Sequence, residues 1–119
     1  MARFLLVLQP RDAAGDRALM DALQPLLEAL QAEAEHRTAA HLSALMRGGP
    51  DQLRMQLFAD VQAKSGGPVL ELALMSREPM VKGAPQSRAV FEDLLRCVEQ
   101  RLPQFALCFR SDRDGALAP

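Results

Sequence analysis

The chain has 119 residues, a common size for one domain, and its 49% hydrophobic and 24% charged residues exclude a disordered protein. The formal net charge of −1 gives no electrostatic signature of a nucleic-acid-binding or membrane-surface protein, and without Trp or Tyr there is little aromatic surface for stacking on bases or sugars. The one early apolar run ends at Pro10, so neither a signal peptide nor a membrane span is predicted.

The first half of the chain is predicted to form a strand followed by one long helix. Residues 3–9 (RFLLVLQ) are apolar at both alternating positions, which is typical of a strand covered on both faces. From Asp16 to Arg47 apolar residues recur at helical spacing, and a Gly-Gly-Pro sequence then provides a helix stop. Because Pro25 removes a backbone hydrogen bond inside this segment, we expect the long helix to be kinked near Pro25.

The second half is predicted to contain two strands, a second helix and a last strand. These elements are expected at residues 53–63, 69–77, 90–102 and 105–110. The order βαββαβ resembles the ferredoxin-like, split βαβ arrangement, which implies a four-stranded, mainly antiparallel sheet with both helices on one face. We expect a single α+β domain at residues 1–110 and a flexible C-terminal tail at residues 111–119.

The segment KSGG, residues 64–67, joins the two middle strands. A phosphate-binding loop of the common type has its glycines before the lysine and a helix after it, whereas here the lysine comes first and a strand follows. Two adjacent glycines between strand-like runs instead predict a tight hairpin turn, because such turns need positive φ. With Gly66 and Gly67 as the turn residues, Ser65 is expected to oppose Pro68.

This register divides the hairpin into two different sides. One side is almost wholly apolar and is expected to face the helices. The other side is expected to oppose Phe58 to Met75, Asp60 to Ala73 and Gln56 to Arg77. We predict that this side is a surface for a partner or for a second copy of the chain, comprising Phe58, Ala73, Met75, Gln56 and Arg77. The alternative is a solvated face with scattered apolar residues.

A second candidate site lies in the loop before the second helix. Arg77, Lys82 and Arg88 gather there, and the N-terminus of the helix, with Ser87 as a candidate cap, favours anions. This segment is expected either to bind a carboxylate or phosphate or to be a solvated connection.

No catalytic, cofactor-binding or metal-binding residues are predicted. His36 and His41 are five residues apart, which on a helix places them about 140° apart around the axis, so they do not converge on one metal ion. Cys97 and Cys108 form neither a disulfide framework nor a metal-binding spacing, and both are expected to be reduced, buried thiols of a cytoplasmic protein.

These features favour a small cytoplasmic protein-interaction module without enzymatic activity, such as an adaptor, a regulator, a secretion chaperone or an immunity-type protein. Its partner is expected to be a second copy of the chain, another protein or both, rather than nucleic acid or a membrane. The alternative is a small-molecule-binding enzyme or sensor of the dimeric α+β-barrel type, with a pocket between the sheet face and the long helix. The lack of a coherent set of proton-transfer residues favours the first hypothesis.

Overall fold

The computed structural model describes residues 1–13 and 15–114. The elements follow one another in the order β1 (Ala2–Pro10), α1 (Asp16–Asp21), α2 (Gln24–Ala29), β2 (Glu33–Arg37), β3 (His41–Gly48), β4 (Leu53–Lys64), β5 (Gly67–Ser76), the 3₁₀ helix η1 (Met80–Lys82), α3 (Pro85–Arg101), β6 (Phe105–Arg110) and α4 (Ser111–Asp114). Among the described residues, no helix is both long and apolar enough to cross a membrane.

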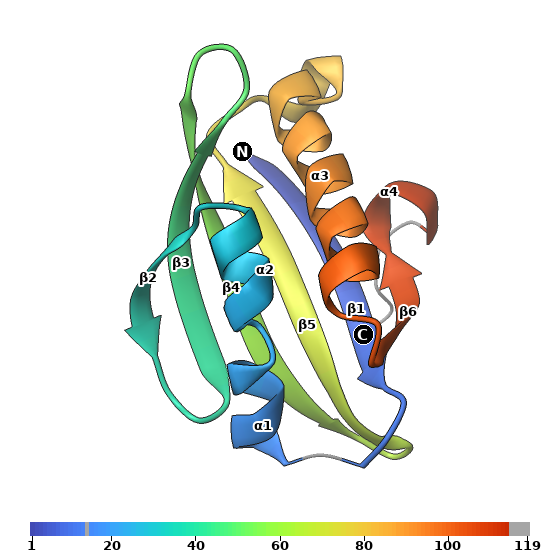
Figure 1. Cartoon of the computed structure of the whole chain (residues 1–119). Coiled ribbons are helices and arrows are strands. Elements are labelled where there is room, and N and C mark those ends of the chain that lie inside the picture. Colours follow the sequence, from blue (N-terminus) through green and yellow to red (C-terminus); the bar gives the residue numbers. More distant parts are fainter. Residues whose placement is uncertain (14, 115–119) are drawn as a thin grey trace.

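The strands form one antiparallel sheet in the order β2-β3-β4-β5-β1-β6. β1 therefore lies between β5 and β6, although it comes first in the sequence. Figure 1 shows α1, α2 and α3 on the same side of the sheet, with α4 beside β6. The chain is an α+β protein, but the predicted four-stranded ferredoxin-like arrangement is wrong, because the sheet has six strands and the helices of the first half are short.

The long helix predicted between Asp16 and Arg47 is replaced by two short helices and two strands. Pro25 lies in the first turn of α2, where a backbone N–H is not needed, so it helps to begin a new helix rather than kinking a long one. Gln31 then adopts a left-handed backbone conformation with a φ of 54°, which is incompatible with a continuing helix.

The apolar residues expected on the last turns of that helix lie on β3 instead. This strand buries every second side chain, namely Leu42, Ala44 and Met46, and leaves the intervening side chains partly or fully exposed. β2 pairs with β3 at the edge of the sheet, and all five of its residues are exposed. Its charged side chains protect this edge from pairing with other chains.

β4 and β5 form the predicted hairpin, but its register differs from the expected one by two residues. Lys64 opposes Gly67, so the turn residues are Ser65 and Gly66 rather than the two glycines. Because side chains alternate between the two faces of a sheet, a shift of two residues leaves every side chain on its predicted face.

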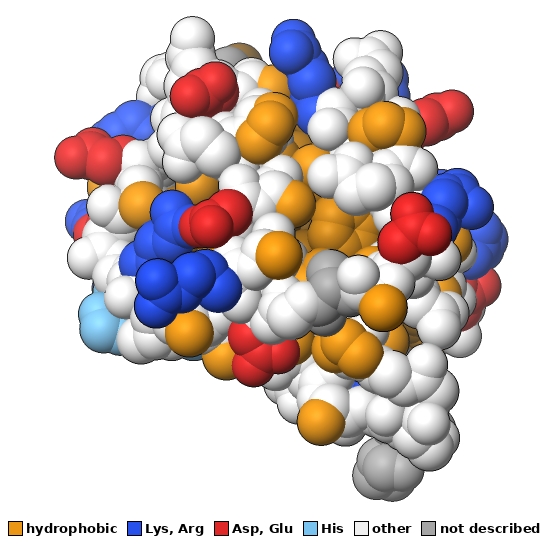
Figure 2. All heavy atoms as spheres, turned by 60° about the horizontal axis from the view of Figure 1, so that its bottom comes forward, with side chains coloured by type: hydrophobic (Ala, Val, Ile, Leu, Met, Phe, Trp, Pro, Cys, Tyr) orange, Lys and Arg blue, Asp and Glu red, His pale blue; other side chains and the backbone are white. Residues whose placement is uncertain are grey.

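The hydrophobic core lies between the helices and the sheet. Alternate strand residues and the inner side chains of α1, α2 and α3 are buried there, and the rings of Phe4 and Phe91 stack with centroids 5.1 Å apart. Figure 2 brings the lower end of Figure 1 forward and shows hydrophobic side chains in a central hollow, with charged side chains mostly around it.

The predictions for the end of the chain have a mixed outcome. The second helix is confirmed as α3, which begins at Pro85, a residue suited to the first turn of a helix, and the last strand is confirmed as β6. The expected flexible tail at residues 111–119 is described only as far as Asp114, and residues 115–119 lie outside the described part.

Gly67 offers a test of the turn, because its φ of 110° is a conformation that other residues rarely adopt. We expect Gly67→Val to lower the free energy of unfolding by about 1–2 kcal/mol, since a β-branched residue resists positive φ. Gly66→Val is the matched control, because Gly66 has no positive φ and an added Cβ meets no described atom within 4 Å. Urea unfolding followed by circular dichroism measures both variants, and equal losses would contradict this assignment of the turn.

Candidate functional site

The candidate site is the face of the sheet opposite the helices, which we call the open face. None of the helices α1, α2 and α3 lies on this side (Figure 1). The strand register places the following side chains on the open face: Arg3, Leu5, Val7 and Gln9 from β1; His41, Ser43, Leu45 and Arg47 from β3; Arg54, Gln56, Phe58, Asp60 and Gln62 from β4; and Val69, Glu71, Ala73 and Met75 from β5.

Apolar side chains lie at the centre of the open face. Phe58 opposes Ala73, and Gln56 opposes Met75 two positions farther along the same strands, so the expected opposition of Phe58 to Met75 is wrong. Phe58, Ala73 and Met75 are half-buried although α1, α2 and α3 are on the other side of the sheet. Arg77 follows β5 directly and lines a shallow pocket with Gln56 and Met75. The five residues predicted as a partner surface are therefore neighbours, and their binding of a partner stays a prediction.

The two histidines lie on neighbouring strands, β2 and β3, so the angular separation expected for a helix is wrong. His41 Nδ1 lies 2.6 Å from Asp60 Oδ1, and the rings of His36 and His41 have their centroids 5.9 Å apart. The ring of His41 also lies near that of Phe58, with centroids 6.4 Å apart. The carboxylate of Asp60 thus orients the His41 ring beside the apolar centre.

The chemistry open to this cluster depends on what lies beside the His41–Asp60 pair. No group of three or more described His, Cys, Asp or Glu side chains is placed to hold a metal ion. A histidine oriented by a carboxylate can be a general base only when the proton to be removed is within hydrogen-bond reach. Among the described residues, the His41 side chain makes a hydrogen bond only to Asp60.

The two cysteines are both free thiols, but they differ in exposure. Cys97 on α3 is half-buried and Cys108 on β6 is exposed. The expectation that both are buried is wrong, most clearly for Cys108, because this residue lies where the register of the edge strand β6 shifts against β1.

The N-terminus of α3 already binds a carboxylate. Glu78 Oε1 accepts a hydrogen bond from the backbone N–H of Ser87 at 2.7 Å, and Glu78 Oε2 accepts one from the backbone N–H of Gln86 at 3.1 Å. The side chain of Ser87 does not cap the helix, because its buried hydroxyl contacts that of Ser76 at 2.6 Å and so joins the end of β5 to α3. The anion at this helix end is therefore the protein's own side chain.

The protonation of Glu78 fits this role. Burial raises the pKa of Glu78, but the hydrogen bonds from the backbone N–H groups of Ser87 and Gln86, and from the hydroxyl of Ser87, together lower it more. The pKa of Glu78 consequently lies below its ordinary value, and the carboxylate is the form that the helix end stabilises.

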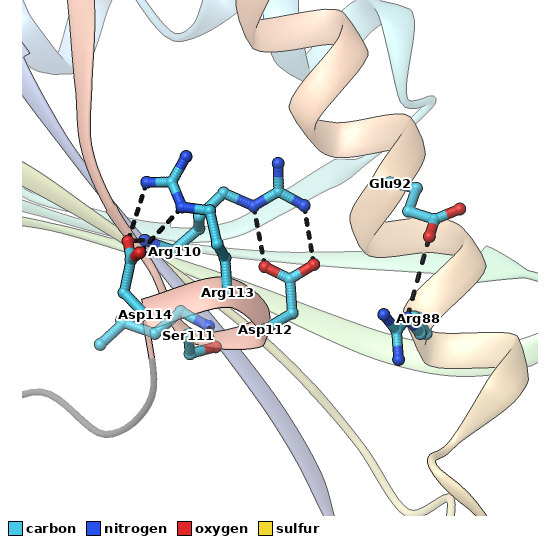
Figure 3. Close-up of polar contacts among 8 residues, drawn as sticks. Arg88, Glu92, Arg110, Ser111, Asp112, Arg113 and Asp114 are labelled. Carbon is cyan, nitrogen blue, oxygen red and sulfur yellow. Dashed lines mark hydrogen bonds and ion pairs between the residues drawn. The ribbon is translucent and has the colours of Figure 1, made fainter.

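The three cations predicted to bind an anion lie on different elements. Arg88 is on α3, where its Nε lies 3.8 Å from Glu92 Oε1 (Figure 3). Lys82 is exposed in η1, and Arg77 lines the shallow pocket on the open face. Neither Lys82 nor Arg88 is among the described residues that line this pocket. The anion site stays a prediction, and Glu78 occupies the helix N-terminus that was expected to contribute to it.

Sequence reasoning missed the ion pair that holds α4 beside β6. Arg110 donates hydrogen bonds from Nε and Nη2 to Asp112 Oδ1 and Oδ2, each 2.8 Å long (Figure 3). These bonds lower the pKa of Asp112, whose side chain is only 6% exposed. Ser111 Oγ accepts a hydrogen bond of 2.9 Å from the backbone N–H of Leu5, which ties α4 to β1. The alternating charges of this segment resemble a solvated tail, so its sequence carries no signal of the contact.

Two further arginines on the open face were also missed, namely Arg3 and Arg47, whereas the alternation of β4 already indicated Arg54. The register expected from the sequence opposed Arg77 to Gln56, and the shift of two residues brings Arg77 beside Arg54 instead. Arg47 could not be placed on this face while its segment was expected to be helical.

Comparison with known proteins does not assign the open face a role. No protein-family model matches the chain, and no curated protein is significantly similar to it. Its function has to be inferred from the chemistry of the surface itself.

Glu78→Gln tests the capping of α3. The variant keeps the size of the side chain but loses its charge, so we expect the free energy of unfolding to fall by about 1 kcal/mol. Glu99→Gln, at an exposed position of the same helix, is the control and should change stability by less than about 0.5 kcal/mol. Urea unfolding near neutral pH measures the difference, and equal values for the two variants would mean that the carboxylate does not stabilise the helix end.

Asp112→Asn tests the ion pair of α4 through its pH dependence. Because the pKa of Asp112 is lowered in the folded state, its carboxylate contributes stability above the unfolded pKa of about 3.9, and this contribution is lost as the pH falls through the folded pKa. The free energy of unfolding should therefore fall more steeply between about pH 5 and pH 2 in the wild type than in Asp112→Asn. Near neutral pH we expect the variant to be less stable by about 1 kcal/mol.

The matched control is Asp12→Asn, at an exposed loop position, which should keep the wild-type pH dependence. Urea unfolding at a series of pH values measures all three proteins. Parallel curves for the wild type and Asp112→Asn would contradict the assignment.

Proposed function

We propose that the chain is a small protein-interaction module that binds its partner through the open face. The observation that supports this most is the apolar centre of Phe58, Ala73 and Met75, on a sheet face that α1, α2 and α3 leave uncovered. Monomeric proteins rarely leave large contiguous apolar patches in water, and such patches commonly mark protein-binding sites. An adaptor, a regulator, a secretion chaperone or an immunity-type protein would each use a surface of this kind without performing chemistry.

The partner is a second copy of the chain or another protein. Sheet faces pack about 10 Å apart with their strands roughly aligned, and the adjacent cross-strand pairs of β4 and β5 offer side chains for such packing. The exposed free thiol of Cys108 fits a reducing compartment, which supports a cytoplasmic location.

A small-molecule-binding enzyme or sensor is less well supported. That function requires a pocket between the open face and a long first helix, and the chain has α1, α2, β2 and β3 in place of that helix. The helices α1 to α3 lie on the opposite side of the sheet (Figure 1).

Phe58→Glu tests the proposal, with Leu72→Glu as its matched control on the neighbouring strand. Phe58 is on the open face, whereas Leu72 is fully buried on the face toward the helices. A charge at Phe58 has to be desolvated in any complex, so we expect Phe58→Glu to stay folded and to weaken self-association or partner binding at least about tenfold. Leu72→Glu should unfold the chain, because an unpaired charge in the core costs several kcal/mol.

Circular dichroism reports folding, light scattering reports self-association, and quantitative mass spectrometry of co-purifying proteins reports partner binding. The proposal is contradicted by a folded, monomeric wild type whose co-purifying proteins are unchanged in Phe58→Glu. If Phe58→Glu instead unfolds the chain as Leu72→Glu does, the chain itself covers the open face.

A further inference from the structure

Three arginines lie side by side at one end of the open face. Arg47 of β3 directly opposes Arg54 of β4. Ser76 at the end of β5 opposes Met55, so Arg77, the next residue, comes beside Arg54. We call Arg47, Arg54 and Arg77 the arginine row. It lies at the upper end of the sheet in Figure 1, where β3 and β5 end and β4 begins.

The arginine row lacks counter-charges within the described chain. Like charges on directly opposed strand positions destabilise a sheet. None of the three arginines forms an ion pair with a described acidic side chain. A row of guanidinium groups that the chain itself does not neutralise is suited to an anionic ligand, because guanidinium binds carboxylates in a bidentate geometry.

The arginine row continues directly into the apolar centre. Arg54 and Arg77 line one shallow pocket together with Gln56 and Met75. Arg3 opposes Met75 on the same face, which adds a further cation beside an apolar side chain. A ligand that crosses this end of the sheet would contact guanidinium groups first, then Met75 about 7 Å and Phe58 about 14 Å farther along, since same-face residues repeat every two positions of a strand.

We propose that the arginine row binds an acidic segment of a partner protein, in which Asp and Glu side chains are followed by apolar residues that cover Phe58 and Met75. This inference rests on the proposed function and names the chemistry of the partner. The arginines orient the segment and speed its association, and the apolar contacts hold it in place.

The charge of the open face favours an acidic partner over a second copy of the chain. The register places cationic side chains of five residues on this face, namely Arg3, Arg47, Arg54, Lys64 and Arg77. The acidic side chains on the face are fewer, namely Glu33, Asp60 and Glu71, and they remain fewer when Glu35, at the irregular position of β2, is counted with them. Four of the cations, Arg3 and the arginine row, lie at one end of the face, whereas Asp60 and Glu71 lie farther along the strands. Two such ends would repel each other if they met in a dimer, whereas an acidic segment is attracted.

The chemistry of the open face also favours a protein over nucleic acid. A nucleic acid would neutralise the arginine row but would leave the apolar centre uncovered. Single-stranded nucleic acid is held by bases stacked on aromatic side chains, and here the chain has no Trp or Tyr, while Phe58 is half-buried with its ring near that of His41.

Fluorescence anisotropy with synthetic probes tests the proposal. The probe is a fluorescein-labelled peptide with an Asp/Glu-rich half and a Leu/Phe-rich half, and the matched probe carries Lys in place of each acid. We expect the wild type to bind the acidic probe with a Kd below about 100 µM at low salt, and the Lys probe at least about tenfold more weakly.

The double variant Arg54→Glu/Arg77→Glu should weaken binding of the acidic probe at least about tenfold. The double variant Arg17→Glu/Arg101→Glu, an equal charge change at exposed positions of α1 and α3, should weaken it less than about twofold.

Thermal unfolding supplies a second readout that separates binding from structure. Arg54→Glu replaces the middle charge of the arginine row by an opposite one, so we expect its melting temperature to rise by roughly 2–5 °C while probe binding falls. A residue with a structural role alone would lose stability and binding together.

The proposal is overturned if the wild type does not bind the acidic probe, if a single-stranded oligonucleotide binds more tightly, or if Arg54→Glu/Arg77→Glu binds the acidic probe as the wild type does. Each of these results leaves the proposed function standing when Phe58→Glu still removes self-association or partner binding. If the arginine variants weaken the acidic probe but Phe58→Glu affects no association, the proposed role of the apolar centre falls and the anionic site remains.

Discussion

The antiparallel pairing of β1 with β5 joins the first strand of the chain to the hairpin and so builds one continuous sheet. It joins Ala2–Leu8 to Leu70–Ser76, and through it β6 connects to the strands β2 to β5. Leu6 is buried toward the helices, and Leu5 is buried on the open face. α1 follows β1, α3 follows β5, and both cover the same side of the sheet (Figure 1). Neither helix covers the opposite side, which is the open face.

Two carboxylates away from the open face bind groups of the chain itself, whereas the arginine row forms no ion pair with a described acidic side chain. Glu78 satisfies two of the N–H groups that the first turn of α3 leaves without a helical acceptor. Asp112 binds the guanidinium of Arg110 at the end of β6. Arg47 and Arg54, by contrast, oppose each other as like charges, which lowers stability. A local cost of this kind, on a face with a half-buried apolar centre, is expected where a surface serves binding rather than folding.

Local patterns predicted the elements whose burial depends on their own residues. The strand at residues 3–9, the hairpin, α3 and β6 all appear where the apolar spacing indicated. The segment from Asp16 to Arg47 was predicted wrongly, because Leu42 and Leu45 fit a helical spacing while the burial of β3 follows a period of two. β2 is fully exposed, so it has no apolar pattern that would reveal a strand.

Which side chains of β4 and β5 share a face follows from their spacing along the chain, because alternation along a strand survives a register error of two residues. The position of Arg54 between Arg47 and Arg77 does not follow from spacing, since cross-strand neighbours depend on the register and on β3 being a strand. Nor does the contact of Glu78 with the N-terminus of α3 follow from spacing, because that contact depends on the path of a loop. Spacing along the chain sets alternation, whereas the packing of the whole sheet sets register and loop path, and these determine which charges meet.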